Sequence, residues 1–241
     1  MTSPQPRIGV LRFPGTCDDR DALWALAALD AEAIFVWHAE TELPDLDAVV
    51  LPGGFSYGDY LRCGAIARFA PSMEAVAEFA DDGGLVLGIC NGFQILCEAG
   101  LLPGVLRRNE SLSFICRDVS LVVERSDTPF TTRCAEGQRL TIPVKHGEGC
   151  WYADDALYDE LEARRQIVLR YAEPVNGSRD DVAGVVNERG NVMGLMPHPE
   201  HAVDPLLGSA DGALILSSLV EAARERALAP AAAPELIRHY V

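Results

Sequence analysis

The stretch Gly-Leu-Val-Leu-Gly-Ile-Cys-Asn-Gly-Phe-Gln, residues 84–94, decides the fold expected for this chain. Its apolar part, residues 85–89, predicts a buried strand, and a helix is expected to start at about Asn91. Cys90 then lies at the tip of a sharp strand-to-helix turn, and glycines two residues to either side leave room for the backbone. This pattern is the cysteine version of a nucleophile elbow, in which the helix N-terminus favours thiolate over thiol.

The alternative for Cys90 is a buried apolar cysteine, one of the commonest core residues. The strand, the paired glycines and the helix favour the nucleophile instead, and Met-Pro-His-Pro-Glu, residues 196–200, supplies a partner. His198 and Glu200 are two residues apart, so in extended chain both lie on the same side. His198 can therefore serve as the base for Cys90 while Glu200 orients the imidazole.

His201 extends this segment to His-Pro-Glu-His, a sequence that also suggests a metal site. It lacks the His-Glu-x-x-His spacing that places two histidines on one helix face, and its prolines oppose a helix. We therefore predict no metal here.

A third element is the apolar run at residues 49–51, which ends in Pro-Gly-Gly. Hydrolysis through a thioester passes through a tetrahedral oxyanion, which requires hydrogen-bond donors aimed at it. The backbone N–H groups of Gly54 and Asn91 are the expected pair. Alone, Pro-Gly-Gly marks any turn after a strand, and its order with the other two elements makes it part of a site.

Charge and composition limit which partners the protein can bind and in which cell compartment it is expected. The chain has 241 residues, a net charge of −16 and no cluster of Lys or Arg, which argues against nucleic acid or an anionic membrane as partner. The N-terminus shows no secretory signal, and no apolar run reaches the length of a membrane span. Seven cysteines without a Cys-x-x-Cys pair suit reduced thiols, so we expect a cytoplasmic protein.

The N-terminal half alternates between strands and helices, as a doubly wound sheet requires. Strands are expected at residues 7–13, 33–37, 48–51 and 85–89, and helices at 19–29, 71–80 and 91–99. Because the strands are continuous apolar runs, both faces of the sheet are expected to be covered. The turns after these strands then meet along one edge, where open α/β sheets place their sites.

Beyond about Arg107 strands predominate, at residues 113–124, 139–143, 166–171, 181–186 and 192–196, before a final helix at 209–228 capped by Ser209. A turn at residues 187–190 makes the last two strands a hairpin that leads into His198. We therefore predict an α/β fold with a doubly wound, mostly parallel central sheet, helices on both faces and an additional small antiparallel β region. Residues 1–228 are expected to form one domain and residues 229–241 an Ala/Pro-containing extension.

The motifs together resemble a known family. Gly-Ile-Cys-Asn-Gly-Phe-Gln, Pro-Gly-Gly and Pro-His-Pro-Glu are similar to those of the triad-type (class I) glutamine amidotransferases. Within that group the chain most resembles the glutaminase subunits of phosphoribosylformylglycinamidine synthases. Gly-Gly-Phe-Ser-Tyr-Gly-Asp from residue 53 and Lys-His-Gly-Glu-Gly at residues 145–149 separate this subfamily from its relatives.

The resemblance implies a role for each motif residue. A cysteine attacks the side-chain amide of glutamine, a histidine acts as base and later protonates departing ammonia, and a glutamate orients the histidine. Two backbone N–H groups hold the oxyanion, and two further residues bind glutamine. The resemblance assigns the nucleophile to Cys90, the base to His198 and the orienting carboxylate to Glu200. It assigns the oxyanion-binding N–H groups to Gly54 and Asn91, and glutamine binding to Gly53 and Gln94.

The resemblance also implies partners. Similar proteins carry no cofactor and pass ammonia through a channel to a separate large synthetase subunit. That subunit uses ATP and Mg to aminate formylglycinamide ribonucleotide in purine biosynthesis, and a small third subunit bridges the two. The absence of a phosphate-binding loop motif from this sequence agrees with that division of labour. Residues 53–62 and 143–149 are the candidates for the partner-facing surface.

One departure from the family pattern is visible. The family has Asn-Cys-Asp after the Gly-[Ser/Thr] of its first loop, whereas here Thr16 precedes Cys17-Asp18-Asp19. We expect that loop to lie away from the triad. For Lys145, the only lysine, and His146, we expect a partner contact or a structural ion pair rather than catalysis.

Two other functions fit the same residues. One is a different hydrolase on a related fold, such as a γ-glutamyl peptidase. The other is a non-catalytic binding or chaperone module whose cysteine acts as a sensor. The ordered Gly-Gly, Cys and His-x-Glu elements favour the glutaminase over both.

Overall fold

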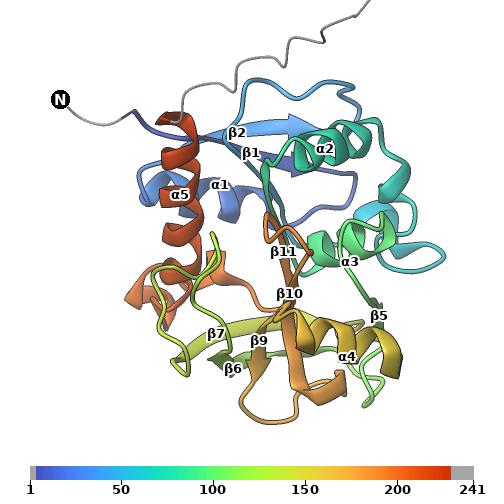
Figure 1. Cartoon of the computed structure of the whole chain (residues 1–241). Helices are drawn as coiled ribbons and strands as arrows, with labels where there is room; N and C mark the ends of the chain where they lie inside the picture. Colours follow the sequence, from blue (N-terminus) through green and yellow to red (C-terminus); the bar gives the residue numbers. More distant parts are fainter. Residues whose placement is uncertain (1–3, 229–241) are drawn as a thin grey trace, which may run out of the picture.

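The computed structural model describes residues 4–228, so the expected extension at residues 229–241 lies outside the described part. A nine-stranded sheet runs through the molecule in the order β2-β1-β3-β4-β11-β10-β9-β6-β7 (Figure 1). Strands from β2 to β11 in this order are parallel, and those from β11 to β7 are antiparallel. A second, two-stranded antiparallel sheet pairs β5 with β8. The predicted α/β class is confirmed, and the antiparallel strands continue the main sheet.

The parallel strands are β1 (Arg7–Arg12), β2 (Glu32–Trp37), β3 (Ala48–Leu51), β4 (Leu85–Ile89) and β11 (Val192–Leu195). The antiparallel ones are β6 (Ile115–Val123), β7 (Arg139–His146), β9 (Ile167–Tyr171) and β10 (Val182–Val186), and the small sheet contains β5 (Val105–Arg107) and β8 (Cys150–Tyr152). Every residue of β3, β4 and β11 is buried, as expected of central strands covered on both faces. In β6 and β7 buried and more exposed residues alternate along part of each strand, which indicates one covered face.

Helices cover both faces of the parallel part. In Figure 1, α1 (Asp19–Ala28) and α5 (Gly212–Leu228) lie on one side of the sheet, and α2 (Pro71–Asp81) and α3 (Asn91–Glu98) on the other. The remaining helix, α4 (Asp155–Ala163), lies at the antiparallel end. Among the described residues, the structure contains no helix with the length and apolar character needed to span a bilayer.

Most predicted boundaries agree with the structure to within a few residues, and the differences have physical reasons. Strand β7 continues through Pro143 to His146 because it is an edge strand, where a missing N–H is tolerated. The final helix begins at Gly212, so the predicted cap at Ser209 is wrong; its hydroxyl accepts from the Asp211 N–H instead (3.1 Å). Helix α4 was not predicted.

The topology brings four loops to one edge of the sheet. Strands β1, β3, β4 and β11 are parallel neighbours, so their carboxyl ends lie together. The chain order reverses between β1 and β3, which is the kind of position where open α/β sheets bind ligands. The loops after these strands carry Asp18, Gly53, Cys90 and His198.

Candidate active site

Cys90 occupies the predicted sharp turn between β4 and α3. Its backbone has φ 51° and ψ −105°, a region that costs a non-glycine residue on the order of 1–3 kcal/mol. The turn fits only because Gly92 has no side chain, since a Cβ there would lie 1.9 Å from the carbonyl oxygen of Leu51. The predicted strand, turn and helix around the cysteine are therefore confirmed.

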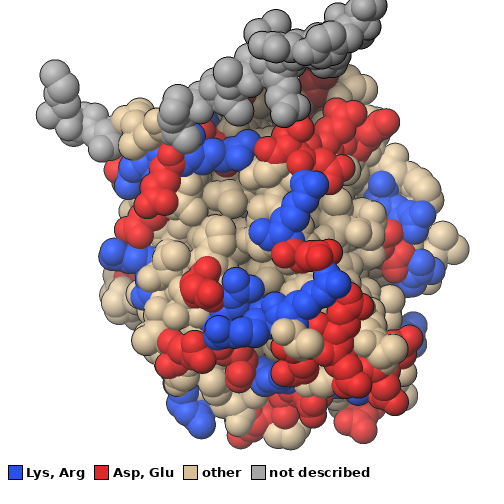
Figure 2. Space-filling view, viewed as in Figure 1, with Lys and Arg blue, Asp and Glu red and all other residues tan. Residues whose placement is uncertain are grey.

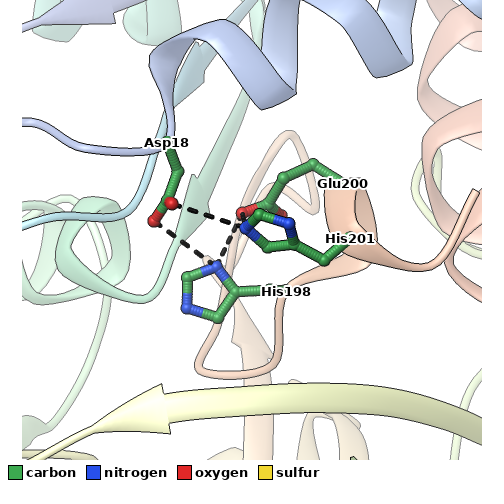
Figure 3. A group of neighbouring side chains, drawn as sticks. All are labelled: Asp18, His198, Glu200 and His201. Carbon is green, nitrogen blue, oxygen red and sulfur yellow. Dashed lines mark hydrogen bonds and ion pairs between the residues drawn. The ribbon is translucent and has the colours of Figure 1, made fainter. Parts of the chain in front are cut away.

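His198 and Glu200 follow β11 and point toward each other (Figure 3). The distance from His198 Nδ1 to Glu200 Oε1 is 2.6 Å, and both side chains are fully buried. An ionised carboxylate only accepts, so Nδ1 carries the proton of this hydrogen bond. The other ring nitrogen, Nε2, is buried and has no hydrogen-bond partner among the described residues.

Cys90 lies close enough to the His198 ring to act on it electrostatically. Burial lowers the pKa of His198, but the negative charges of Glu200 and Cys90 outweigh it and raise the pKa to about 10. The ring is therefore protonated at neutral pH. The structure thus brings together the cysteine, histidine and glutamate that the sequence singled out.

A cavity of about 160 Å³ opens next to the cysteine. Its walls include Cys90, Gly54, Gln94, Asp59, Lys145 and Glu148. The cavity is smaller than the roughly 300 Å³ at which drug-sized ligand sites begin, so it suits a small substrate. The Cys90 thiol lies 3.7 Å from the Lys145 carbonyl oxygen at its edge.

Of the residues predicted to hold an oxyanion and glutamine, Gly54 and Gln94 line this cavity, and Asn91 directly follows Cys90 in its wall. The Asn91 side chain accepts from the Ser56 N–H (3.1 Å) and donates to Gln94 Oε1 (2.9 Å), and Gln94 Nε2 donates to the Glu148 carbonyl (2.6 Å). These bonds fix the loop after β3 against the start of α3. They set the backbone of Gly54 and Asn91 beside Cys90.

Gly53, which was assigned to glutamine binding, directly precedes the cavity wall, and that assignment stays a prediction. The cavity is lined by Gly54 and not by Gly53. A Cβ at Gly53 would lie 2.4 Å from Asp18 Oδ2 and 2.6 Å from His198 Cε1, so this glycine packs behind the histidine.

Comparison with known proteins identifies the family. Residues 5–211 match the family described as "CobB/CobQ-like glutamine amidotransferase domain". The chain is 57% identical over 225 residues to the protein named phosphoribosylformylglycinamidine synthase subunit PurQ of Salinibacter ruber, covering 89% of this chain and 95% of the relative. The subunit of the same name in Rubrobacter xylanophilus is 57% identical over 218 residues, covering 90% and 99%. The chain belongs to the PurQ family of glutamine amidotransferases.

Solved structures agree with this assignment. A chain in "Structure of PurLQS from Thermotoga maritima" is 46% identical with a TM-score of 0.84, over 90% of this chain and 99% of that one. A protein from Thermoplasma acidophilum, described as a proposed subunit of GMP synthase, has a TM-score of 0.64 over 92% and 96%. At 16% identity that second likeness concerns the fold alone.

The expectation that the first loop of this PurQ family member lies away from the triad is wrong. Asp18 Oδ2 is 3.7 Å from His198 Nδ1, and Asp18 Oδ1 is 3.4 Å from His201 Nε2 (Figure 3). The reason is strand order: β1 and β3 are neighbours, and the N–H groups of Cys17 and Asp18 both donate to the Gly53 carbonyl (3.1 and 3.2 Å). The signal for Asp18 is topological and not local: its loop directly follows β1, beside the point where the strand order reverses.

Lys145 forms the ion pair that was one of its two expected roles. Its ammonium group donates to Asp18 Oδ1. His146 is instead a buried member of a hydrogen-bond network, with Nδ1 3.0 Å from Asn109 Oδ1. Burial, together with the positive charge of His198, lowers the pKa of His146 to about 4, so the ring is neutral.

Asp18, His198, Glu200 and His201 have ligand-type atoms within 4.8 Å of one another, a grouping compatible in principle with a metal ion (Figure 3). The Lys145 ammonium already binds Asp18, and His198 and Glu200 bind each other. A metal ion here has to displace both contacts. The expectation of no metal stays a prediction.

Proposed function

We propose that this chain is the glutamine-hydrolysing subunit of a phosphoribosylformylglycinamidine synthase, acting in purine biosynthesis in the cytosol. The observation that carries the proposal is the buried His198–Glu200 pair, whose ring has a free Nε2 and lies within the electrostatic influence of Cys90 at its elbow. Names of relatives at 57% identity and the Thermotoga maritima complex support the choice of reaction.

In the proposed mechanism the Cys90 thiolate attacks the side-chain amide carbon of glutamine. The resulting oxyanion is stabilised by the N–H groups of Gly54 and Asn91. His198 transfers its Nε2 proton to the amide nitrogen, and the carbon–nitrogen bond breaks. Ammonia departs, and the glutamyl group remains bound to the Cys90 sulfur as a thioester. The now neutral His198 takes a proton from water, which attacks the thioester, and glutamate departs as the thiolate returns.

We propose that ammonia then passes through a channel to a separate large synthetase subunit, with a small bridging subunit completing the complex. That partner uses ATP and Mg, and this chain contributes no cofactor of its own. The loop at residues 53–62 suits a docking role because Tyr60 and Leu61 are 74% and 89% exposed next to the cavity wall. Clustered exposed apolar side chains of this kind mark interaction surfaces.

The charged surface is consistent with a protein partner rather than a polyanion. On the face shown in Figure 2, basic side chains lie next to acidic ones. Among the ion pairs of the described residues, Arg164 pairs with Glu160 at 2.9 Å, and Arg170 pairs with Glu162.

The test uses Cys90→Ala in the assembled complex. We expect loss of glutamine-dependent synthesis with full retention of synthesis from added ammonium. Cys63→Ala is the matched control, because Cys63 lines the same cavity and has no part in the mechanism. Glutamine use by Cys90→Ala contradicts the nucleophile assignment, and release of larger amines from γ-glutamyl peptides by the wild-type chain favours the peptidase.

A further inference from the structure

Asp18 is a buried carboxylate that the mechanism above does not use. It stands at the N-cap position of α1, where aspartate usually accepts a hydrogen bond from the first turn of the helix. Here its side chain makes no capping bond and turns toward His198 instead (Figure 3). Asp18 therefore has the residue type preferred for an N-cap but does not use its side chain to cap the helix.

The two oxygens of Asp18 have different neighbours. Oδ1 accepts from the Lys145 ammonium and lies 3.4 Å from His201 Nε2. Oδ2 is directed at His198, 3.7 Å from the same Nδ1 that binds Glu200. Lys145 thus anchors Oδ1. Oδ2 is held beside the His198 ring, because Gly53 packs against both Oδ2 and the edge of the imidazole.

Lys145 allows this carboxylate to remain ionised inside the protein. The Asp18 side chain is only 5% exposed and that of Lys145 is 31% exposed. Burial alone raises the pKa of Asp18, but the His201 hydrogen bond, the His198 charge and Lys145 outweigh it and hold that pKa well below its usual range. Asp18 is therefore a fixed negative charge next to His198.

The charged and titratable groups around His198 come from several elements. They are Glu200 and His201 on its own turn, Cys90 at the elbow, Asp18 before α1, and Lys145 and His146 at the end of β7. Of these, Glu200 and Asp18 are the carboxylates beside Nδ1.

We propose that Asp18, anchored by Lys145, is a second positioning carboxylate of the triad, which stabilises the protonated His198 ring together with Glu200. The inference rests on the proposed glutaminase function. Asp18 does not contact the reacting atoms. It acts through the histidine, because its negative charge keeps His198 protonated until His198 transfers that proton to the departing ammonia.

The first test is the titration of His198 in the full chain, followed by NMR with labelled histidine; the chain has only five histidines. In Asp18→Asn we expect the pKa of His198 to fall by about one unit or more, as for loss of an opposite charge at this distance. Asp19→Asn is the matched control: Asp19 is the next residue, equally buried, and pairs with Arg12 at 3.3 Å, away from the site. It should leave the titration unchanged.

The second test is the pH profile of glutamine hydrolysis in the assembled complex. In Asp18→Asn the alkaline limb of kcat/KM should move to lower pH by the same amount as the NMR titration, while synthesis from ammonium stays at the wild-type level. A purely structural role instead lowers activity equally at every pH.

Asp18→Asn leaves Lys145 without its partner, so the double variant Asp18→Asn/Lys145→Met provides a neutral pair if the single variant does not fold. It too should show the lowered His198 pKa. An unshifted His198 titration in both variants overturns the inference. If wild-type complex does not hydrolyse glutamine, the proposed function fails, whereas the NMR titration still decides the role of Asp18.

Discussion

The backbone N–H of Cys90 donates to the carbonyl of Leu195 at 2.8 Å. This bond joins the nucleophile turn after β4 to the end of β11, from which the chain proceeds to His198. The two strands pair in parallel, with Ile89 opposite Leu195, so both turns start from the same level of the sheet. Residues far apart in the sequence are thereby fixed against each other before any side chain is considered.

His198→Ala should abolish most glutamine hydrolysis. The variant loses the group that protonates departing ammonia, and general acid–base catalysis typically contributes about 10²–10⁴-fold in rate. The measurement is glutamate release by the complex under saturating glutamine. Synthesis from ammonium should persist, because that reaction bypasses the triad, and loss of both activities points to a structural failure instead.

Gly92→Ala should destabilise the elbow and inactivate glutamine hydrolysis. The new methyl group meets the Leu51 carbonyl, and overpacking of this kind costs about 1–3 kcal/mol of unfolding free energy. Urea unfolding measures the loss. Gly147→Ala is the control for stability, because a Cβ there meets only the Phe114 ring at 3.7 Å.

The part of the site that depends on local geometry could be predicted from the sequence. The glycines around Cys90 and the two-residue spacing of His198 and Glu200 predict an elbow and a histidine–carboxylate pair, because these constraints act over a few residues. The continuous apolar runs of β3 and β4 predict central strands for the same reason, since burial on both faces leaves no polar position.

The parts that sequence reasoning missed depend on long-range order. Asp18 reaches the triad because β1 lies next to β3, a neighbourhood that no local pattern reveals. For Lys145 an ion pair was one of two expected roles, and the partner that forms it, Asp18, is 127 residues away. Helix α4 is the exception, a missed element that did carry a local signal: the Asp154 side chain accepts from the Leu157 N–H at 2.9 Å, and Tyr158 and Leu161 form its buried face.

Gln94→Leu should raise KM for glutamine with a smaller effect on kcat. The change removes the hydrogen bonds to Asn91 and to the Glu148 carbonyl that hold the cavity wall. A net loss of about 1 kcal/mol for each of the two hydrogen bonds, about 2 kcal/mol together, corresponds to a rise in KM of up to roughly thirtyfold. Gln138→Leu, in an exposed turn, is the control, and an unchanged KM in Gln94→Leu contradicts a role in shaping the pocket.

The two buried histidines near the site predict opposite dependences of stability on pH. His146 has its pKa lowered from 6.5 to about 4, so below pH 6.5 the unfolded chain takes up a proton that the folded chain does not. Its contribution to stability is therefore lost as the pH falls toward 4. His198 has its pKa raised to about 10, so its contribution is complete below pH 6.5 and is lost as the pH rises toward 10.

The contribution of His146 to the pH dependence of stability can be separated from that of His198 with His146→Gln. This variant removes the neutral buried imidazole but leaves the triad in place. The variant should be less stable than wild type at about pH 7, because a buried hydrogen-bonded ring is lost. Between about pH 7 and about pH 5, however, its free energy of unfolding should fall less than that of wild type, because one histidine no longer takes up a proton on unfolding. Urea unfolding at both pH values measures this difference, and parallel losses in the two proteins contradict a depressed pKa at His146.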